Sequence, residues 1–139
     1  MGCDIHLHVE LKVDGKWHHY DNVKIGRNYD LFGLMAGVRS IDFSPIVDPK
    51  GFPPDASDMV RYQFGYDSYF HTPSWLNEDE IELLKERAKE EGIFNYSFEH
   101  ETMRGSYLFH NDYTKESLKS LQERYPHIEG YRFVFWFDS

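Results

Sequence analysis

Strict alternation of polar and apolar side chains over residues 2–13 constrains the fold more than any other feature of this 139-residue sequence. A period of two is typical of a strand that buries one face. Asp14 and Gly15 follow, a pair favoured in two-residue hairpin turns, and residues 16–21 then return as a second strand. The hairpin therefore needs other elements to cover its apolar face, which carries Cys3, Ile5, Leu7, Val9 and Leu11.

The opposite face of the first strand carries side chains of the kinds that bind metal ions. The hairpin register predicts that Glu10 lies opposite His19. It also predicts that His8 lies opposite Asp21, and a slip of one residue would exchange the two faces. Alternate residues of a strand stand about 7 Å apart, so a further ligand must come from another segment. We therefore predict a site for zinc, manganese or magnesium, with Asp4, His6, His8 and His19 as ligands. A polar face that simply meets solvent is the alternative.

The rest of the chain divides into helices, loops and a terminal strand. Asn28 is the expected N-cap of a helix that continues to Val38, and Asn77 with Glu80 forms a capping box before another helix. A proline-rich loop over residues 40–58 is long enough to indicate a functional role. We also predict a short helix over residues 57–64, an aromatic loop over 65–75, helices over 78–91 and 115–125, one or two strands within 93–110, and a strand over 131–139.

The terminal strand alternates Phe133, Phe135 and Phe137 with other side chains, which predicts a central position in the sheet. We expect a single domain, residues 1–139, of the α+β class. Its antiparallel or mixed sheet contains the N-terminal hairpin and the C-terminal strand, and about three helices cover the apolar face. A pocket is expected on the opposite face under the loops of residues 40–75. Arg132, Trp136 and Asp138 join this pocket if the last strand neighbours the first.

Composition narrows the classes of function. The net charge of −9 and the lack of a basic patch argue against a nucleic-acid-binding protein. No run approaches the roughly 20 apolar residues of a membrane span. The N-terminus does not read as a signal peptide, and a single cysteine agrees with a reducing compartment. We therefore expect a cytoplasmic protein with no membrane partner.

Aromatic residues make up 17% of the chain and are candidates for stacking on a planar ligand. Arg27, beside a capped helix start, is a candidate donor to an anion. Asp67 and His71 could bind a metal ion, or act as a base and the residue that orients it. A loop that only holds the next helix in place would also explain them. The predicted catalytic residues are Glu10, Asp67 and His71, and the predicted ligand-binding residues are Trp17, Arg27, Tyr29, Trp75 and Trp136.

Several segments together resemble a family of uncharacterised proteins encoded by bacteriophages and prophages. The resemblance spans nearly the whole chain and is most specific at the N-terminus. It implies a phage protein in the cytosol of a host cell, where small proteins of this kind destroy or sequester nucleotide signals of host defence. The segments are MGCDIH (1–6), RNYDLFGLMAGVR (27–39), PKGFPPDAS (49–57), HTPSWL (71–76) and FVFWFD (133–138).

Two functional hypotheses follow, and the residues leave open whether the protein is an enzyme. In the first, a bound divalent metal assists hydrolysis of a phosphate ester or nucleotide signal, with Glu10 or Asp67 as general base. In the second, the same pocket binds a nucleotide ligand and sequesters it without turnover. An inhibitor of another protein that uses the acidic residues 78–101 ranks third. A small-molecule ligand is the expected partner, and association into a homo-oligomer stays open.

Overall fold

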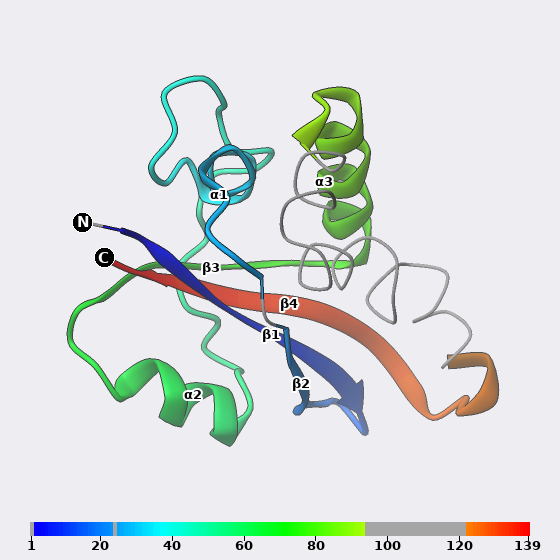
Figure 1. Ribbon diagram of the computed structural model, residues 1–139. Coiled ribbons are helices and arrows are strands. Elements are labelled where there is room, and N and C mark those ends of the chain that lie inside the picture. Colours follow the sequence, from blue (N-terminus) through cyan, green and yellow to red (C-terminus); the bar gives the residue numbers. More distant parts are fainter. Residues whose placement is uncertain (1, 24, 94–121) are drawn as a thin grey trace.

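The computed structural model describes residues 2–23, 25–93 and 122–139. Within these residues, four strands form one antiparallel sheet in the order β2-β1-β4-β3 (Figure 1). Every neighbouring pair runs antiparallel, and with three helices the predicted α+β class is confirmed. The strands are β1 (Asp4–Val13), β2 (Lys16–Val23), β3 (Phe70–Leu76) and β4 (Ile128–Asp138), and the helices are α1 (Tyr29–Ala36), α2 (Asp58–Gly65) and α3 (Glu78–Glu90).

The N-terminal hairpin forms as predicted near its turn and departs from the prediction further along. Asp14 and Gly15 both have positive φ, 53° and 76°, as a type I′ turn requires. Glu10 lies opposite His19 as expected, but a bulge then shifts the register, so that His8 lies opposite Asn22. The predicted pairing of His8 with Asp21 is therefore wrong. The bulge adds one residue to β2, which exchanges the faces of the residues that follow it.

Strand β4 is central, as the sequence predicts, and it lies beside β1 along almost its whole length. The phenylalanines of β4 and the odd-numbered residues of β1 form the main hydrophobic core with α1 and α3. Cys3 is part of this core, and burial raises the pKa of its thiol. Figure 1 shows α1 and α3 on this side of the sheet.

The opposite face of the sheet has a smaller apolar cluster of its own. Val134 and Trp136 of β4 are fully buried there. Helix α2 lies across this face (Figure 1), so one of the three helices covers the side that carries Glu10. The cluster contains Ala56, Val60, Val134 and Trp136, with Phe52, Phe64, Phe70 and Trp75 packed against it.

The predicted helix caps are present. The Asn28 side chain accepts a hydrogen bond from the Leu31 amide, and Gly37 ends α1 in the left-handed conformation. Asn77 and Glu80 form the expected capping box at the start of α3. Helix α2 is capped by Ser57, whose hydroxyl accepts from the Val60 amide. Helices α1, α2 and α3 each begin and end within two residues of the predicted bounds.

The aromatic loop predicted over residues 65–75 is in part a strand, because Phe70–Leu76 pairs with β4 as β3. Pro73 favoured a loop in the sequence, but β3 lies at the edge of the described sheet, where a missing amide donor costs little. A bulge separates His71 from Ser74, and Thr72 has a φ of 52°. The strands predicted within 93–110 and most of the helix predicted over 115–125 lie outside the described residues.

None of the described helices is both long and apolar enough to span a membrane.

Gly33 lies where α1 packs tightly against the following loop. A Cβ at Gly33 would stand 2.5 Å from the Cβ of Ser40. Alanine gains about 1 kcal/mol of helix propensity, but overpacking costs about 1–3 kcal/mol, so we expect Gly33→Ala to lower the free energy of unfolding in urea. Gly65→Ala is the control, because no atom lies within 4 Å of its added Cβ and a gain of about 0.4–1 kcal/mol is expected. A Gly33→Ala protein as stable as the wild type would contradict this packing.

Candidate ligand-binding site

Two cavities lie on the face of the sheet that α2 covers, and Trp17 and Asp55 line both of them. Their volumes, about 530 and 640 Å³, fall within the range of about 300–1,000 Å³ found for small-molecule sites. The first, here called the aromatic cavity, is lined by Lys12, Trp17, Pro53, Pro54, Asp55, Trp75 and Arg132. The second, the polar cavity, is lined by residues 15–19 of the hairpin and residues 55–59 at the start of α2.

Arg132 is the central polar residue of the aromatic cavity and is only 3% exposed. Its guanidinium carbon lies 4.1 Å from the ring centre of Trp17 and 5.6 Å from that of Trp75. Its Nε donates to Glu10 at 2.8 Å and its Nη1 to Asp55 at 3.0 Å. The remaining nitrogen, Nη2, is buried and has no hydrogen-bond partner among the described residues. The cation is thus paired with two carboxylates and lies beside two indole rings, and one of its donor groups is unused.

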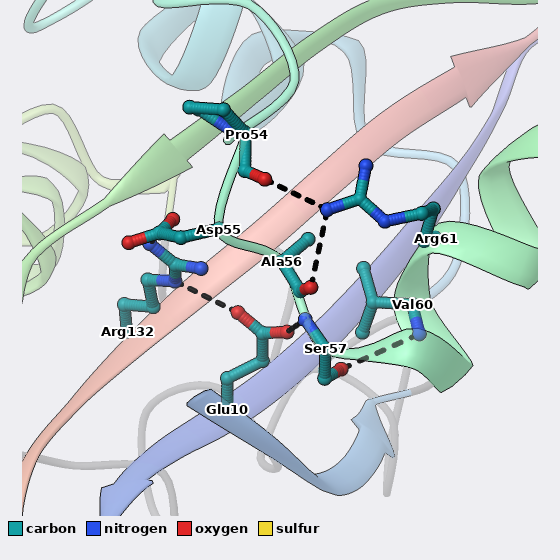
Figure 2. A network of polar contacts seen from close by, with 8 residues as sticks. All are labelled: Glu10, Pro54, Asp55, Ala56, Ser57, Val60, Arg61 and Arg132. Carbon is teal, nitrogen blue, oxygen red and sulfur yellow. Dashed lines mark hydrogen bonds and ion pairs between the residues drawn. The ribbon is translucent and has the colours of Figure 1, made fainter. Parts of the chain in front are cut away.

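Glu10 is completely buried, and both of its carboxylate oxygens are engaged (Figure 2). Oε1 accepts from Arg132, and Oε2 accepts from the Ser57 amide at 2.7 Å. Removing a carboxylate from water is costly unless opposite charge and hydrogen bonds replace the lost hydration, and here both do. The arrangement favours a role in holding the loop before α2 against the sheet over the predicted role as general base.

The loop over residues 53–57 forms the wall that the two cavities share, and Arg61 holds it from the side of α2. Arg61 Nη2 donates to the Pro54 carbonyl at 2.8 Å and to the Ala56 carbonyl at 3.3 Å. Figure 2 shows these contacts beside the Glu10–Ser57 hydrogen bond. Because polar contacts hold the loop at both ends, little conformational entropy remains to be lost when a ligand binds.

The four predicted metal ligands do not converge on one point, because they make three separate contacts. Asp4 accepts two hydrogen bonds from Arg27, at 2.8 and 3.3 Å, and this contact lowers the pKa of the Asp4 carboxyl. His6 Nε2 lies 3.5 Å from Asp138. His8 Nδ1 lies 3.1 Å from His19 Nε2. In the part of the chain that the structure describes, no three His, Cys, Asp or Glu side chains are arranged to hold a metal ion.

One of the two paired histidines, His8, packs against a buried tryptophan. The His8 ring stacks on Trp136, with centroids 5.0 Å apart and an interplanar angle of 24°. Trp136 is fully buried. Its ring therefore offers no exposed surface for the ligand stacking that was predicted for it. A hydrogen bond between two imidazoles needs one donor and one acceptor, so at least one of His8 and His19 is neutral. His19 also lines the polar cavity.

Other predicted site residues lie away from the cavities. The Tyr29 hydroxyl accepts from the Cys3 amide at 3.0 Å, and its ring packs on the main core. Asp67 accepts from the Tyr69 amide at 2.9 Å. His71 contacts the hydroxyls of Thr72 and Ser139 at 2.9 and 2.8 Å. Asp67 and His71 therefore each have local partners, and only Trp17 and Trp75 of the predicted ligand-binding residues meet in the aromatic cavity.

The sequence interpretation did not identify Asp55, the two prolines before it or Lys12 as site residues. Arg132 was expected in the pocket only if the last strand neighboured the first, which it does. One signal in the sequence was available for Asp55: two consecutive prolines followed by an acid in a long loop. An arginine in an otherwise aromatic strand was the signal for Arg132, because a charge at a buried position needs a partner.

Comparisons with models of protein families, with curated proteins and with solved structures gave no match to this chain.

Glu10→Gln tests the buried ion pair. The substitution removes the charge that balances Arg132 and leaves that cation, among the described residues, with the exposed Asp55 as its only carboxylate partner. Breaking a buried pair typically costs about 3–5 kcal/mol, and we expect a loss of this order in the free energy of unfolding measured with urea. Glu86→Gln on the exposed side of α3 is the control and should stay within about 0.5 kcal/mol of the wild type. Equal stabilities of the two variants would refute the role given to Glu10.

Proposed function

We propose that this protein binds a small ligand with an aromatic ring, with a nucleotide as the best candidate, and sequesters it without turnover. The observation that carries the proposal is the pair of tryptophans, Trp17 and Trp75, in the wall of one cavity of about 530 Å³. Both indoles are only partly buried. Arg132 lies 4.1 Å from the ring centre of Trp17 and Lys50 Nζ lies 3.6 Å from that of Trp75, so a ligand ring would stack on the surface that these cations leave uncovered. Stacking of a base on an aromatic side chain contributes about 1–3 kcal/mol.

The polar cavity supports a ligand that also carries phosphate. Lys16, His18 and His19 line it and offer hydrogen-bond donors. Asp58 and Met59 line it as well, in the first turn of α2, where backbone amides lack partners within the helix. A base in the aromatic cavity and a phosphate on the polar side would together use both parts of the site.

Sequestration is favoured over hydrolysis because the predicted catalytic groups are already engaged in contacts within the protein. Glu10 is buried in an ion pair, and Asp67 and His71 have local partners outside the two cavities. None of these groups is available beside the tryptophans to activate a water molecule. The proposed protein therefore binds by stacking and by charge, and leaves the ligand intact.

Metal-assisted hydrolysis is the second candidate, because one observation favours it. The 3.1 Å between His8 Nδ1 and His19 Nε2 is close to the roughly 3.3 Å that separates two imidazole nitrogens bound to one tetrahedral zinc ion. Two histidines would leave open positions for water and for a phosphate oxygen. The remaining ligands are not identified among the described residues.

The resemblance to phage proteins adds a biological context to this proposal. A protein that binds a nucleotide tightly in the host cytosol would lower the free concentration of a defence signal. This anti-defence role depends on the resemblance alone and on no contact in the structure.

Binding is tested by titrating the protein with AMP, GMP and cyclic mono- and dinucleotides, followed by calorimetry and by quenching of tryptophan fluorescence. Trp17→Ala and Trp75→Ala should each weaken binding of the ligand by about 5- to 150-fold, the equivalent of about 1–3 kcal/mol. Tyr62→Ala is the control, because Tyr62 is an exposed aromatic residue on α2 that lines neither cavity. The proposal fails if none of these nucleotides binds.

Turnover is tested by incubating protein and bound nucleotide, denaturing the protein by heat, and analysing the released ligand by chromatography. Intact nucleotide is the expected result. Three results together would support the hydrolase and refute sequestration. The nucleotide would be cleaved, but not in the presence of a chelator. Elemental analysis would find stoichiometric metal, and both the metal and the cleavage would be lost in His8→Ala and His19→Ala.

A further inference from the structure

We propose that the Asp55 carboxylate occupies, in the free protein, the place on Arg132 that a phosphate or carboxylate of the ligand takes when it binds. Asp55 is thus an internal competitor that the ligand must displace. The inference rests on the proposed function of the two cavities and adds the chemical group that the site recognises. It also identifies Arg132 as the residue that contacts this group.

The two partners of the Arg132–Asp55 ion pair are held very differently. The Arg132 side chain is 4% exposed, whereas the Asp55 side chain is 65% exposed. Glu10 pairs with the arginine at 2.8 Å, and the two indoles lie beside its guanidinium. Because the Asp55 side chain is largely exposed, its carboxylate can turn into water and recover its hydration, and Arg132 keeps its ion pair with Glu10.

Asp55 uses only part of what the guanidinium offers. Its Oδ1 accepts from Nη1, and Nη2 of the same guanidinium is buried without a hydrogen-bond partner among the described residues. An oxyanion binds a guanidinium best through two parallel hydrogen bonds. A ligand oxyanion that accepts from both Nη1 and Nη2 would satisfy the donor that Asp55 leaves unused.

The pinned loop explains why Asp55 does not take both donors itself. The carbonyls on either side of it, at Pro54 and Ala56, are held by Arg61 (Figure 2). The Ser57 amide is held by Glu10. With the backbone fixed at these points, the short aspartate side chain reaches one nitrogen of Arg132. A free anion has no such restriction.

Asp55 also has the right place for this role, because it lines both cavities. A ligand with its ring on the tryptophans and its anion on the polar side would have to pass the position of Asp55. At that position the anion would meet Arg132 on one side, and Lys16 and His19 line the cavity on the other. The expected ligand class is therefore an aromatic ring joined to a phosphate or carboxylate by a short link.

The test compares Asp55→Asn with Asp42→Asn, using AMP, adenosine and inorganic phosphate as probes. Asn keeps the size of the side chain and removes the charge that competes for Arg132. We expect Asp55→Asn to bind AMP and inorganic phosphate about fivefold or more tightly than the wild type and to bind adenosine unchanged. Asp42→Asn makes the same change in net charge at an exposed position of the long loop over residues 40–58. Asp42 lines neither cavity, so the affinities of this variant should match those of the wild type. Circular dichroism and thermal unfolding verify that both variants fold.

The outcomes separate this inference from the proposed function. Equal affinities of the two variants for AMP, or weaker binding by Asp55→Asn, overturn the competitor role and leave nucleotide binding standing. Tighter binding of phosphate by Asp55→Asn, without any nucleotide binding, upholds the competitor role and removes the proposed function. If neither variant binds either anion at millimolar concentration, the inference is overturned as well.

Discussion

The buried ion pair between Glu10 and Arg132 is the interaction on which the functional face of this protein depends. It joins the two central strands at a matched register position, and through the Ser57 amide it also attaches the loop that leads into α2. A buried pair of charges contributes little net stability when compared with apolar residues, but it strongly penalises arrangements in which either charge is unpaired. Glu10 and Arg132 therefore specify where the loop lies more than they strengthen the fold.

The two faces of the sheet have different roles, one in the hydrophobic core and the other in the candidate binding site. One face carries the main hydrophobic core and is covered by α1 and α3, so it supplies most of the buried hydrophobic area. The other face combines a small apolar cluster around Trp136 with buried polar groups and two cavities beside the loop over residues 53–57. Tryptophans hold the arginine by stacking, and the arginine in turn holds an aspartate that solvent can reach. Such an arrangement suits recognition of a ring that carries an anion, because apolar contact and charge lie within one site.

How well the site could be predicted differs from residue to residue. Trp17 and Trp75 were predicted to bind the ligand because the chain is rich in aromatic residues that can stack on a planar group. The strand period correctly placed Glu10 on the polar face of β1, and it was therefore predicted to act in catalysis. Its actual partner, Arg132, lies 122 residues away in the sequence and was not predicted. Asp4 and the three histidines share one face as expected, yet Asp4 pairs with Arg27 and His6 with Asp138, and only His8 and His19 contact each other. Strand spacing places side chains on a face, but it does not determine which of them meet.

The sequence by itself determined the local elements: the hairpin with its Asp14-Gly15 turn, the capped helices, and the alternation that separates the two faces of β1 and β4. These follow from side-chain period and from hydrogen bonds between residues three or four positions apart, which the order of residues specifies directly. Only the tertiary structure decided that β3 forms an edge strand, that a bulge shifts β2, and that Arg132 lies beside both Trp17 and Trp75 with Asp55 as its exposed partner. Those features depend on contacts between distant segments, where burial and the pairing of charge select one arrangement among many that the local pattern permits.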